Sequence, residues 1–244
     1  MLFRSSGLRR PHDIEHYLLR IGGSLGVLVL IESYDSAYGD QYDLDCSDSV
    51  QELINRARRG EIDGCMNGAP CSTWSRARFR PGGPPPLRDR QHPWGRPGLS
   101  RRDREHCDLH SRLMCNGLDI LEAVVKGGGD ALNEHPADPG RDPFPSIHAT
   151  SRFRGLMART GMKSHEFPQC MAGALSKKPT TLTGTLRDVP RYFPTQCTHV
   201  SHAMVLSGID EHGNFRTRAG QTYPPQMCES IATCFLAEYR RRQS

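Results

Sequence analysis

Apolar and polar residues alternate in blocks along the first quarter of the chain, in an order that predicts strand, helix, strand. The aliphatic run Gly26 to Ile31 is typical of a parallel strand buried on both faces, and it ends in the acidic stretch 32–35. Pro11 and Asp13 mark the start of an amphipathic helix. This alternation favours an α/β fold with a mainly parallel sheet and helices on both faces. The predicted strands are 1–3, 26–31 and 62–66, and the predicted helices are 13–22 and 48–59.

The second half has one clear helical stripe and a weaker pattern after it. Apolar residues from Leu109 to Val125 lie on one helical face that ends in three glycines, and Ala131 and Leu132 then enter a strand. Residues 137–200 are irregular in pattern. We expect one domain over residues 1–244. The remaining predicted elements are helices at 152–160 and 225–240 and strands near 164–174, 180–186 and 203–206.

The segment 76–104 differs in composition from the rest of the chain. It holds nine arginines, a Pro-Gly-Gly-Pro-Pro-Pro run and almost no apolar periodicity. Loops of this length are usually functional or disordered, so we predict a long exposed loop whose arginines contact phosphate. The alternative is a solvated flexible insertion.

Overall charge and hydropathy limit the partners and the location. The chain has 32 Lys and Arg against 27 Asp and Glu, a formal net charge of +5, which permits binding to polyanions. No run approaches the roughly 20 apolar residues of a membrane span, and residues 1–10 lack the features of a secretory signal. We expect an intracellular protein of the cytoplasm or nucleus that is not secreted and has no membrane partner.

The nine cysteines are an odd number and form no C-x-x-C pair, which argues against a disulfide framework and a zinc ribbon. Most are expected to be buried free thiols. Cys197, His199 and His202 are the nearest approach to a metal cluster, to which His106, Cys107 and His110 could add, but these spacings match no standard site. The sequence therefore predicts no bound metal.

Two chemically competent side chains follow or end predicted strands. Cys71 lies in the small-residue turn Gly68-Ala69-Pro70-Cys71, where a thiolate can face a cleft and where Arg76 and Arg78 would lower its pKa. Glu134 ends a later strand and would stand at the same edge of the sheet, where a carboxyl can donate to a heterocycle nitrogen. The alternatives are a packed structural thiol and a surface carboxylate.

These motifs resemble those of the cytosine-C5 DNA methyltransferases, including divergent domains found beside mobile elements. Gly68 to Cys71 is similar to the family's Gly-Pro-Pro-Cys nucleophile motif, and Asn133 to Pro136 is similar to its Glu-Asn-Val or Glu-Asn-Pro motif. Ser5-Ser6-Gly7 resembles the cofactor turn, and residues 220–225 resemble the Gly-Asn-x-Val-Pro-Pro segment. The resemblance implies a Rossmann-like fold that uses S-adenosylmethionine. The cofactor-binding residues that it implies are Ser6, Gly7, Glu32 or Asp35, Asp43, Gly68, Pro70, Gly220 and Pro224.

The reaction implied by the resemblance is methyl transfer to C5 of cytosine in DNA or, as the second choice, RNA. Cys71 would attack C6 of a flipped-out cytosine while Glu134 assists at N3. Arg76 and Arg78 would hold phosphate or base. Arg216 and Arg218 lie on a possible strand that would contact the target, and residues 137–200 would form a small target-recognition region.

Two other functions remain open at this stage. The chain has one glycine, Gly7, in the cofactor turn, Ala69 in place of a proline and His135 in place of an asparagine. An inactive methyltransferase-like domain that binds nucleic acid or a protein would carry such departures. A small metal-binding interaction protein built on the Cys and His residues between 197 and 234 is the third hypothesis.

Overall fold

Six strands form one mixed sheet in the computed structural model, which describes residues 2–4 and 9–244. Their order across the sheet is β2-β1-β3-β4-β6-β5. The chain is therefore a mixed α/β protein, which confirms the expected class at that level. The strands are β1 (Leu2–Arg4), β2 (Glu32–Tyr34), β3 (Gly64–Asn67), β4 (Asp130–Pro136), β5 (Lys163–Pro168) and β6 (Pro179–Gly184).

Strand direction changes in the middle of the sheet. β3 and β4 are parallel, as are the short pairs that β1 makes with β2 and β3. β6 is antiparallel to both β4 and β5. In this register Tyr34 and Asn67 both face residue 4, and Asn67 faces Asn133. The parallel strands β2 and β3 thus end at one edge of the sheet, before residues 35 and 68, and Glu134 of β4 lies at the same level, one residue past Asn133.

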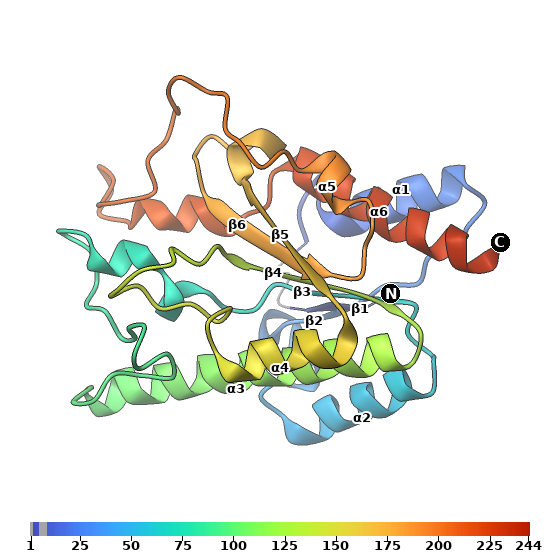
Figure 1. Cartoon of the computed structure of the whole chain (residues 1–244), viewed down its shortest axis with the longest axis horizontal. Helices are drawn as coiled ribbons and strands as arrows, with labels where there is room; N and C mark the ends of the chain where they lie inside the picture. The colour runs from blue at the N-terminus through green and yellow to red at the C-terminus, as the bar shows by residue number, and fades with distance from the viewer. Residues whose placement is uncertain (1, 5–8) are drawn as a thin grey trace.

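Helices cover both faces of the sheet (Figure 1). Successive residues of a strand point to opposite faces, so Cys65 and Ala131 join the core on one side while Met66 and Leu132 join the core on the other. The first face carries α2 (Ser47–Arg58), α3 (Arg101–Lys126) and α4 (Ser151–Thr160), and the second carries α1 (Ile14–Ser24), α5 (Val189–Tyr192) and α6 (Pro225–Gln243).

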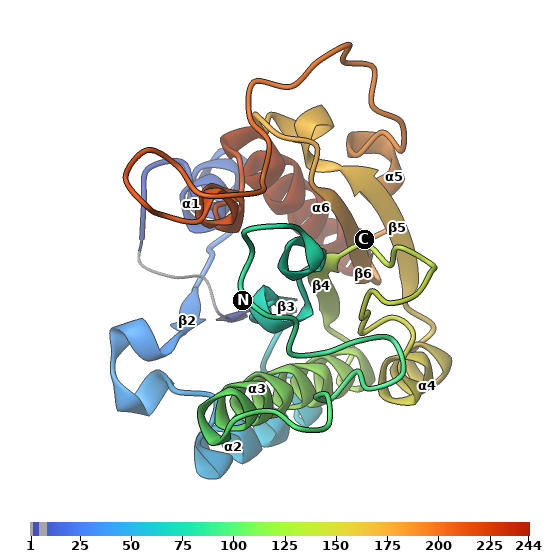
Figure 2. The same ribbon diagram turned by 90° about the vertical axis from the view of Figure 1, so that its left-hand side faces the viewer.

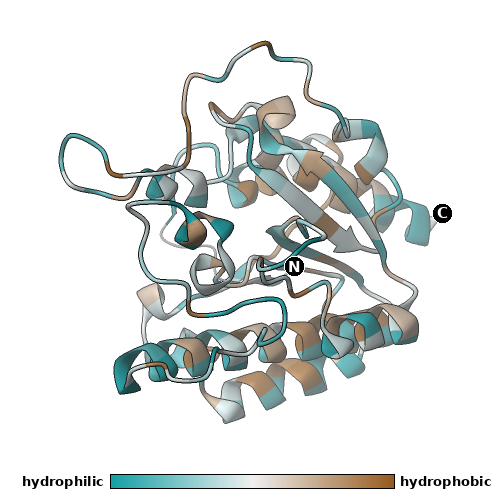
Figure 3. Cartoon of the chain, turned by 60° about the vertical axis from the view of Figure 1, so that its left-hand side comes forward, coloured by the Kyte–Doolittle hydropathy of each residue, from teal (hydrophilic) through white to brown (hydrophobic). Residues whose placement is uncertain are grey.

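Local sequence explains where these helices begin. The Asp13 carboxylate accepts a hydrogen bond from the His16 backbone N–H at 2.8 Å, and Ser100 and Thr150 cap α3 and α4 in the same way. The N-terminal turns of α3 are hydrophilic, and its apolar residues lie farther along, where the helix meets the sheet (Figure 3). The polar start of α3 is thus free to extend beyond the core.

Most predicted elements are confirmed with shifted ends. The helices predicted at 48–59, 152–160 and 225–240 correspond to α2, α4 and α6, and that predicted over 109–125 begins earlier, at Arg101. The region 137–200 is not a separate irregular unit, because β5 and β6 within it belong to the main sheet. The observed bounds of the two strands are 163–168 and 179–184.

The strand predicted at Gly26 to Ile31 is wrong. This run has no strand structure, and the strand begins only at Glu32. The Val27 N–H donates to the Gly22 carbonyl, so the chain folds back over the end of α1. Val27 and Val29 then pack against the α1–α6 core, while Leu28 and Leu30 remain 84% and 71% exposed. The run is therefore buried on one side only, and its aliphatic composition is the same as that of a strand buried on both faces.

The strand predicted at Ala203 to Leu206 is also wrong. Between α5 and the 3₁₀ helix η6 (Arg216–Gln221) the chain has neither a helix nor a strand, and its regular pairing is one isolated bridge between Ile209 and Phe215. Val205 is more than half exposed. The run is apolar but has no neighbouring strand to join.

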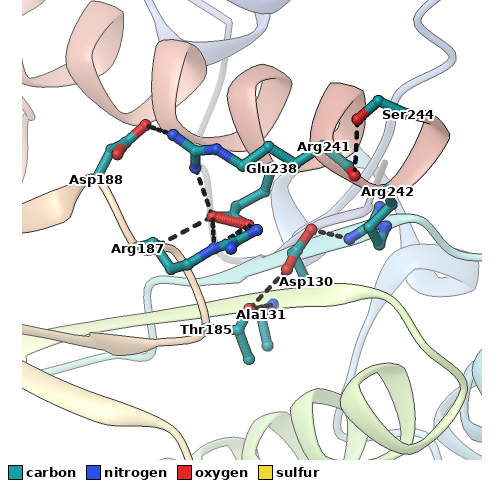
Figure 4. Close-up of polar contacts among 9 residues, drawn as sticks. All are labelled: Asp130, Ala131, Thr185, Arg187, Asp188, Glu238, Arg241, Arg242 and Ser244. Carbon is teal, nitrogen blue, oxygen red and sulfur yellow. Dashed lines mark hydrogen bonds and ion pairs between the residues drawn. The ribbon is translucent and has the colours of Figure 1, made fainter.

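The far end of the sheet is held by charged side chains from α6 (Figure 4). The buried Glu238 carboxylate accepts hydrogen bonds from Arg187 at 2.8 Å and from Arg241 at 2.7 Å. Arg242 pairs with Asp130 at the start of β4. These contacts tie the C-terminal helix to β4 and to the segment after β6. No helix among the described residues is long and apolar enough to cross a membrane.

Candidate active site

Cys71 lies just beyond the end of β3, as the sequence predicts. The backbone leaves β3 at Asn67, passes Gly68 and Pro70, and turns into the 3₁₀ helix η3 (Ser72–Trp74), where the Trp74 N–H donates to the Cys71 carbonyl at 3.0 Å. The half-buried Cys71 lines a cavity of about 700 Å³. Its thiol is therefore open to a ligand in that cavity.

A buried arginine supports the turn that carries Cys71. Trp74 is 2% exposed, and the Arg88 guanidinium lies 4.3 Å from the centre of its ring. Arg88 also donates to the Thr73 hydroxyl at 3.0 Å and to the carbonyls of Pro93 and Cys107 at 2.9 and 2.7 Å. Burial lowers the pKa of Arg88 to about 10. The guanidinium joins η3, the following loop and α3.

The prediction that 76–104 is a uniformly exposed loop is therefore wrong. Leu87 and Arg88 are fully buried, residues 76–79 form the 3₁₀ helix η4, and α3 begins at Arg101. Arg78 donates to the carbonyls of Ser72 and Pro85 at 2.8 and 2.7 Å. Some of the arginines thus hold the loop itself together.

Glu134 is buried within β4 and receives three donors. The Tyr223 hydroxyl donates to its Oε2 at 2.9 Å, and Lys178 Nζ and Gln169 Nε2 each lie 3.4 Å from its Oε1. Lys178 also donates to the Gly220 carbonyl at 3.0 Å. The prediction of a catalytic role is untested, but the surface alternative is excluded because Glu134 is only 4% exposed.

The charges in this cluster act on the thiol of Cys71. Burial raises the pKa of Cys71, the positive charge of Lys178 lowers it, the negative charge of Glu134 raises it further, and the net pKa is above its ordinary value of 9. The main cation acting on the thiol is Lys178, so the expectation that Arg76 and Arg78 lower the pKa is wrong. Cys71 and Glu134 are near enough to interact electrostatically and share one cation.

The donors to Glu134 keep their protons. Burial and the negative charge of Glu134 raise the pKa of Tyr223 well above its ordinary value of 10. Burial lowers the pKa of Lys178, but Glu134 and Cys71 raise it, and the net pKa is above 10.5. The site thus combines an ammonium, a phenol, a carboxyl and a thiol.

His135 follows Glu134 and is 1% exposed, with its ring 6.1 Å from the Trp74 ring. Neither ring nitrogen has a hydrogen-bond partner among the described residues. Burial lowers its pKa well below 6.5, so the ring is neutral. His135 also lines the cavity and offers it a neutral imidazole.

The cavity lining is cationic. Among the described residues that line it there are six lysines and arginines and no carboxylate. The loop after Cys71 and the segment before Tyr223 contribute from either side of the strand ends, which face the viewer in Figure 2. Arg218 belongs to this lining, whereas Arg216 does not, and both are exposed residues of η6 rather than of a strand. The six cations are Arg76, Arg78, Arg80, Lys177, Lys178 and Arg218.

The acidic residues proposed for cofactor binding lie near the end of β2. Asp35 directly follows the strand, and its carboxylate accepts from the Ala37 N–H at 3.0 Å. Glu32 forms an ion pair with Arg56, with contacts of 2.6 and 2.8 Å, which occupies both its oxygens. Asp43 accepts from the Asp45 N–H at 2.9 Å. Asp35 therefore fits the strand-end role better than Glu32.

The other proposed cofactor residues are distributed around the site. Gly68 and Pro70 lie between β3 and Cys71, and Gly220 and Pro224 flank Tyr223 in sequence. The proposed turn residues Ser6 and Gly7 lie outside the described residues.

Sequence reasoning missed Lys178, Gln169, Arg88 and Tyr223. Tyr223 lies inside the 220–225 segment that resembles a family motif, so the sequence indicates that this segment is near the site. The sequence does not indicate that the Tyr223 hydroxyl contacts Glu134. Lys178 and Gln169 reach Glu134 because β5 and β6 form a hairpin beside β4. No local pattern encodes that long-range pairing.

Four potential metal ligands meet away from Cys71. Cys197 Sγ lies 3.5 Å from His199 Nδ1, 3.3 Å from His202 Nε2 and 3.5 Å from Cys170 Sγ. The ligand atoms of all four residues lie within 4.8 Å of one another. Of the other candidates, His106 and His110 instead contact each other on α3, and His110 also contacts the Thr73 hydroxyl. Five of the nine cysteines are buried, which confirms that most thiols are interior.

Comparison with known proteins identified no similar protein. No protein-family model matches the chain, and no curated protein or solved structure matches it.

Proposed function

We propose that the chain transfers a methyl group from S-adenosylmethionine to C5 of cytosine in DNA. The observation that carries this proposal is the meeting of Cys71 and Glu134 at one end of the sheet, beside a cavity lined by cations. The parallel β3 and β4 followed by the antiparallel β6 are compatible with a Rossmann-like methyltransferase fold. The choice of methyl transfer to cytosine rests on the resemblance of the motifs around Cys71 and Glu134 to those of the cytosine-C5 methyltransferases.

The residues after β2 fit an adenosine. Asp35 offers a carboxylate at the strand end, where a ribose hydroxyl can donate to it. The aromatic rings of Tyr34, Tyr38 and Tyr42 gather there, with centroid separations of 5.7 and 6.4 Å. Asp35 and Asp43 would hold the nucleoside of S-adenosylmethionine, which when bound supplies an electrophilic methyl group.

In the proposed reaction Cys71 supplies the nucleophile. Lys178 favours the thiolate, whose Sγ forms a bond to C6 of cytosine and places an electron pair at C5. Glu134 would assist at N3, and Tyr223 and Lys178 hold its oxygens in place. C5 would form a bond to the methyl carbon as the bond between that carbon and the sulfonium sulfur breaks, and C5 would then lose its proton to solvent. The electron pair left at C5 would re-form the C5–C6 double bond and break the Sγ–C6 bond, which returns the thiolate and releases the product.

The cationic lining favours a nucleic acid as the substrate. Phosphate contacts by lysine and arginine provide most non-specific affinity for DNA. A cytosine inside a duplex cannot reach a half-buried thiol, so the base would be flipped into the cavity. Arg76, Arg78 and Arg218 line the cavity and would hold the backbone or the base, while Arg216 would add charge outside it.

Transfer of labelled methyl groups to cytosine-containing DNA tests this proposal. The native chain should label C5, Cys71→Ser should give only background, and Cys46→Ser, which changes an exposed thiol, should retain activity. DNA carrying 5-fluorocytosine should trap a covalent adduct on Cys71, because fluorine cannot leave as a proton does. Cytosine-containing RNA is the parallel substrate.

One combined result would contradict the enzymatic proposal. If the native chain transfers no label and does not bind S-adenosylmethionine, then the cavity serves binding alone. Retained DNA affinity in that case would favour the inactive nucleic-acid-binding domain, for which the cationic lining is the specific observation.

A further inference from the structure

The segment between α5 and α6 lacks the usual means of holding a fixed shape. From Pro194 to Phe215 it has no helix or strand, only the isolated bridge noted above. Its apolar side chains bury little surface: Val200 is fully exposed, Val205 is 57% exposed and Ile209 is 49% exposed. Figure 1 shows this segment, in orange, extending away from the helices and the sheet. Hydrophobic burial therefore contributes little to its position.

The four ligands described above hold this segment against the body of the protein. Cys197, His199 and His202 belong to the segment, whereas buried Cys170 belongs to the 3₁₀ helix η5 (Gln169–Ala172) that follows β5. The Met204 N–H donates to the Leu175 carbonyl at 3.0 Å, which keeps the two chain regions adjacent. The cluster thus joins positions that are 27 residues apart in sequence.

The spacing of these ligand atoms matches a tetrahedral zinc site. With Zn–S bonds of about 2.3 Å and Zn–N bonds of about 2.0–2.1 Å, tetrahedral geometry places ligand atoms roughly 3.3–3.8 Å apart. Cys197 Sγ lies 3.3–3.5 Å from its three partner atoms. A disulfide would instead require a sulfur separation of about 2.05 Å. The donor set of two sulfurs and two imidazoles is one that structural zinc sites use.

We propose that Cys170, Cys197, His199 and His202 bind one structural Zn²⁺ that fixes the segment between α5 and α6. His199 would bind through Nδ1 and His202 through Nε2, the atoms nearest Cys197. Both thiols lose a proton to solvent on binding, so two thiolates neutralise the ion. Four protein ligands fill the tetrahedral positions and leave none for substrate, so this zinc is structural rather than catalytic.

The zinc site has a consequence for the large cavity. His202 and several residues that follow it, including Met204 and Arg218, line that cavity. Zinc would therefore shape one wall of the cavity from outside the Cys71–Glu134 cluster. This role does not depend on which reaction the cavity supports.

Zinc content and spectroscopy of the full chain test the proposal. The protein purified under reducing conditions should contain one zinc per chain by elemental analysis. The cobalt-substituted protein should show the intense visible bands of a tetrahedral site and a thiolate charge-transfer band. Zinc affinity should fall by about 100-fold or more in Cys197→Ala and in His199→Ala. The exposed His199 makes the second variant the one least able to disturb folding.

Matched controls use residues outside the cluster. Cys46→Ala and His212→Ala replace exposed residues of the same types and should keep one zinc per chain. Zinc removal by a chelator should increase proteolytic cleavage between residues 198 and 215 while cleavage elsewhere stays unchanged. A chain without stoichiometric zinc, variants that retain it, or a Cys170–Cys197 disulfide in the reduced preparation would overturn the proposal. None of these readouts uses methyl transfer.

Discussion

Arg88 shows how one side chain can organise a segment that looks disordered from its composition. Its guanidinium is fully buried and bonds to η3, to its own loop and to α3 while lying over Trp74. Arginine has five donors in a rigid fork, so it can satisfy several carbonyls from one position. A residue type that usually marks the surface here forms part of the interior.

We therefore expect Arg88→Met to reduce the free energy of unfolding by about 3 kcal/mol or more, because it leaves buried acceptors without donors. Arg88→Lys should recover only part of this loss, since an ammonium cannot span the same acceptors. Urea unfolding measures the effect. Arg101→Met is the matched control, because the Arg101 side chain is 93% exposed. An equal, small effect of Arg88→Met and Arg101→Met would contradict this interpretation.

The positions of Cys71 and Glu134 could be predicted from sequence, but their surroundings could not. Both residues stand beside recognisable short motifs at strand ends, and the parallel register of β3 and β4 brings those ends together. Lys178 and Tyr223 reach Glu134 from 44 and 89 residues away. Such contacts depend on how the sheet is completed, which local patterns do not encode.

At the scale of secondary structure, the pattern of apolar residues identifies some helices well but identifies short strands poorly. The helices α2, α4 and α6 have long apolar stripes whose period identifies them. Strand β2 has three residues, and the neighbouring run 26–31 was the more apolar candidate. A short apolar run has the same composition whether one or both of its sides are buried. Residues 26–31 form no strand because Val27 and Val29 pack against the core between α1 and α6.

Packing between α3 and α4 should respond to acid through Glu122. Its carboxylate accepts from Arg159 at 2.7 and 2.8 Å and pairs with Lys126, and these partners lower its pKa from 4.5 to about 2. A depressed pKa in the folded state gives stabilisation that is present above pH 4.5 and is lost as the pH falls towards 2.

Glu122→Gln should therefore reduce the free energy of unfolding at pH 7 by about 1–2 kcal/mol, a value that allows for the partly exposed partners. The difference from the native chain should shrink below pH 4.5 and vanish only as the pH falls through 2. Urea midpoints measured across this range provide the test. Glu105→Gln, on an exposed pair of the same helix, should show almost no difference at any pH. A pH-independent effect of Glu122→Gln would contradict the electrostatic explanation.

At the scale of the whole molecule, the charged network around Glu238 and the candidate active site around Cys71 lie at opposite ends of the sheet. The Glu238 network holds the end of α6 to the start of β4, whereas Glu134 lies near the other end of β4 and Cys71 lies beyond the end of β3. Burial raises the pKa of Glu238, but hydrogen bonds from Arg187 and Arg241 lower it, and the net shift is downward. Glu238 is therefore ionised near neutral pH and stabilises the fold.

We expect Glu238→Gln to lower the free energy of unfolding by about 1–3 kcal/mol without changing methyl transfer per folded molecule. Thermal unfolding and labelling assays on the same samples separate the two effects. Glu229→Gln alters an exposed ion pair on the same helix and should leave both unchanged. A loss of transfer by fully folded Glu238→Gln would show that the two ends are coupled.

The hydrogen bond between Tyr223 and Glu134 can form only late in the synthesis of the chain, because 89 residues separate the two partners. Synthesis at about 5–20 residues per second separates the appearance of the two residues by roughly 5–20 s. During that interval the growing polypeptide contains Glu134 but not yet the Tyr223 hydroxyl that donates to it. Helix α1 likewise lacks α6, against which it packs in the folded protein. A chain still attached to its ribosome before residue 223 emerges therefore has a Glu134 carboxyl that lacks this hydrogen bond.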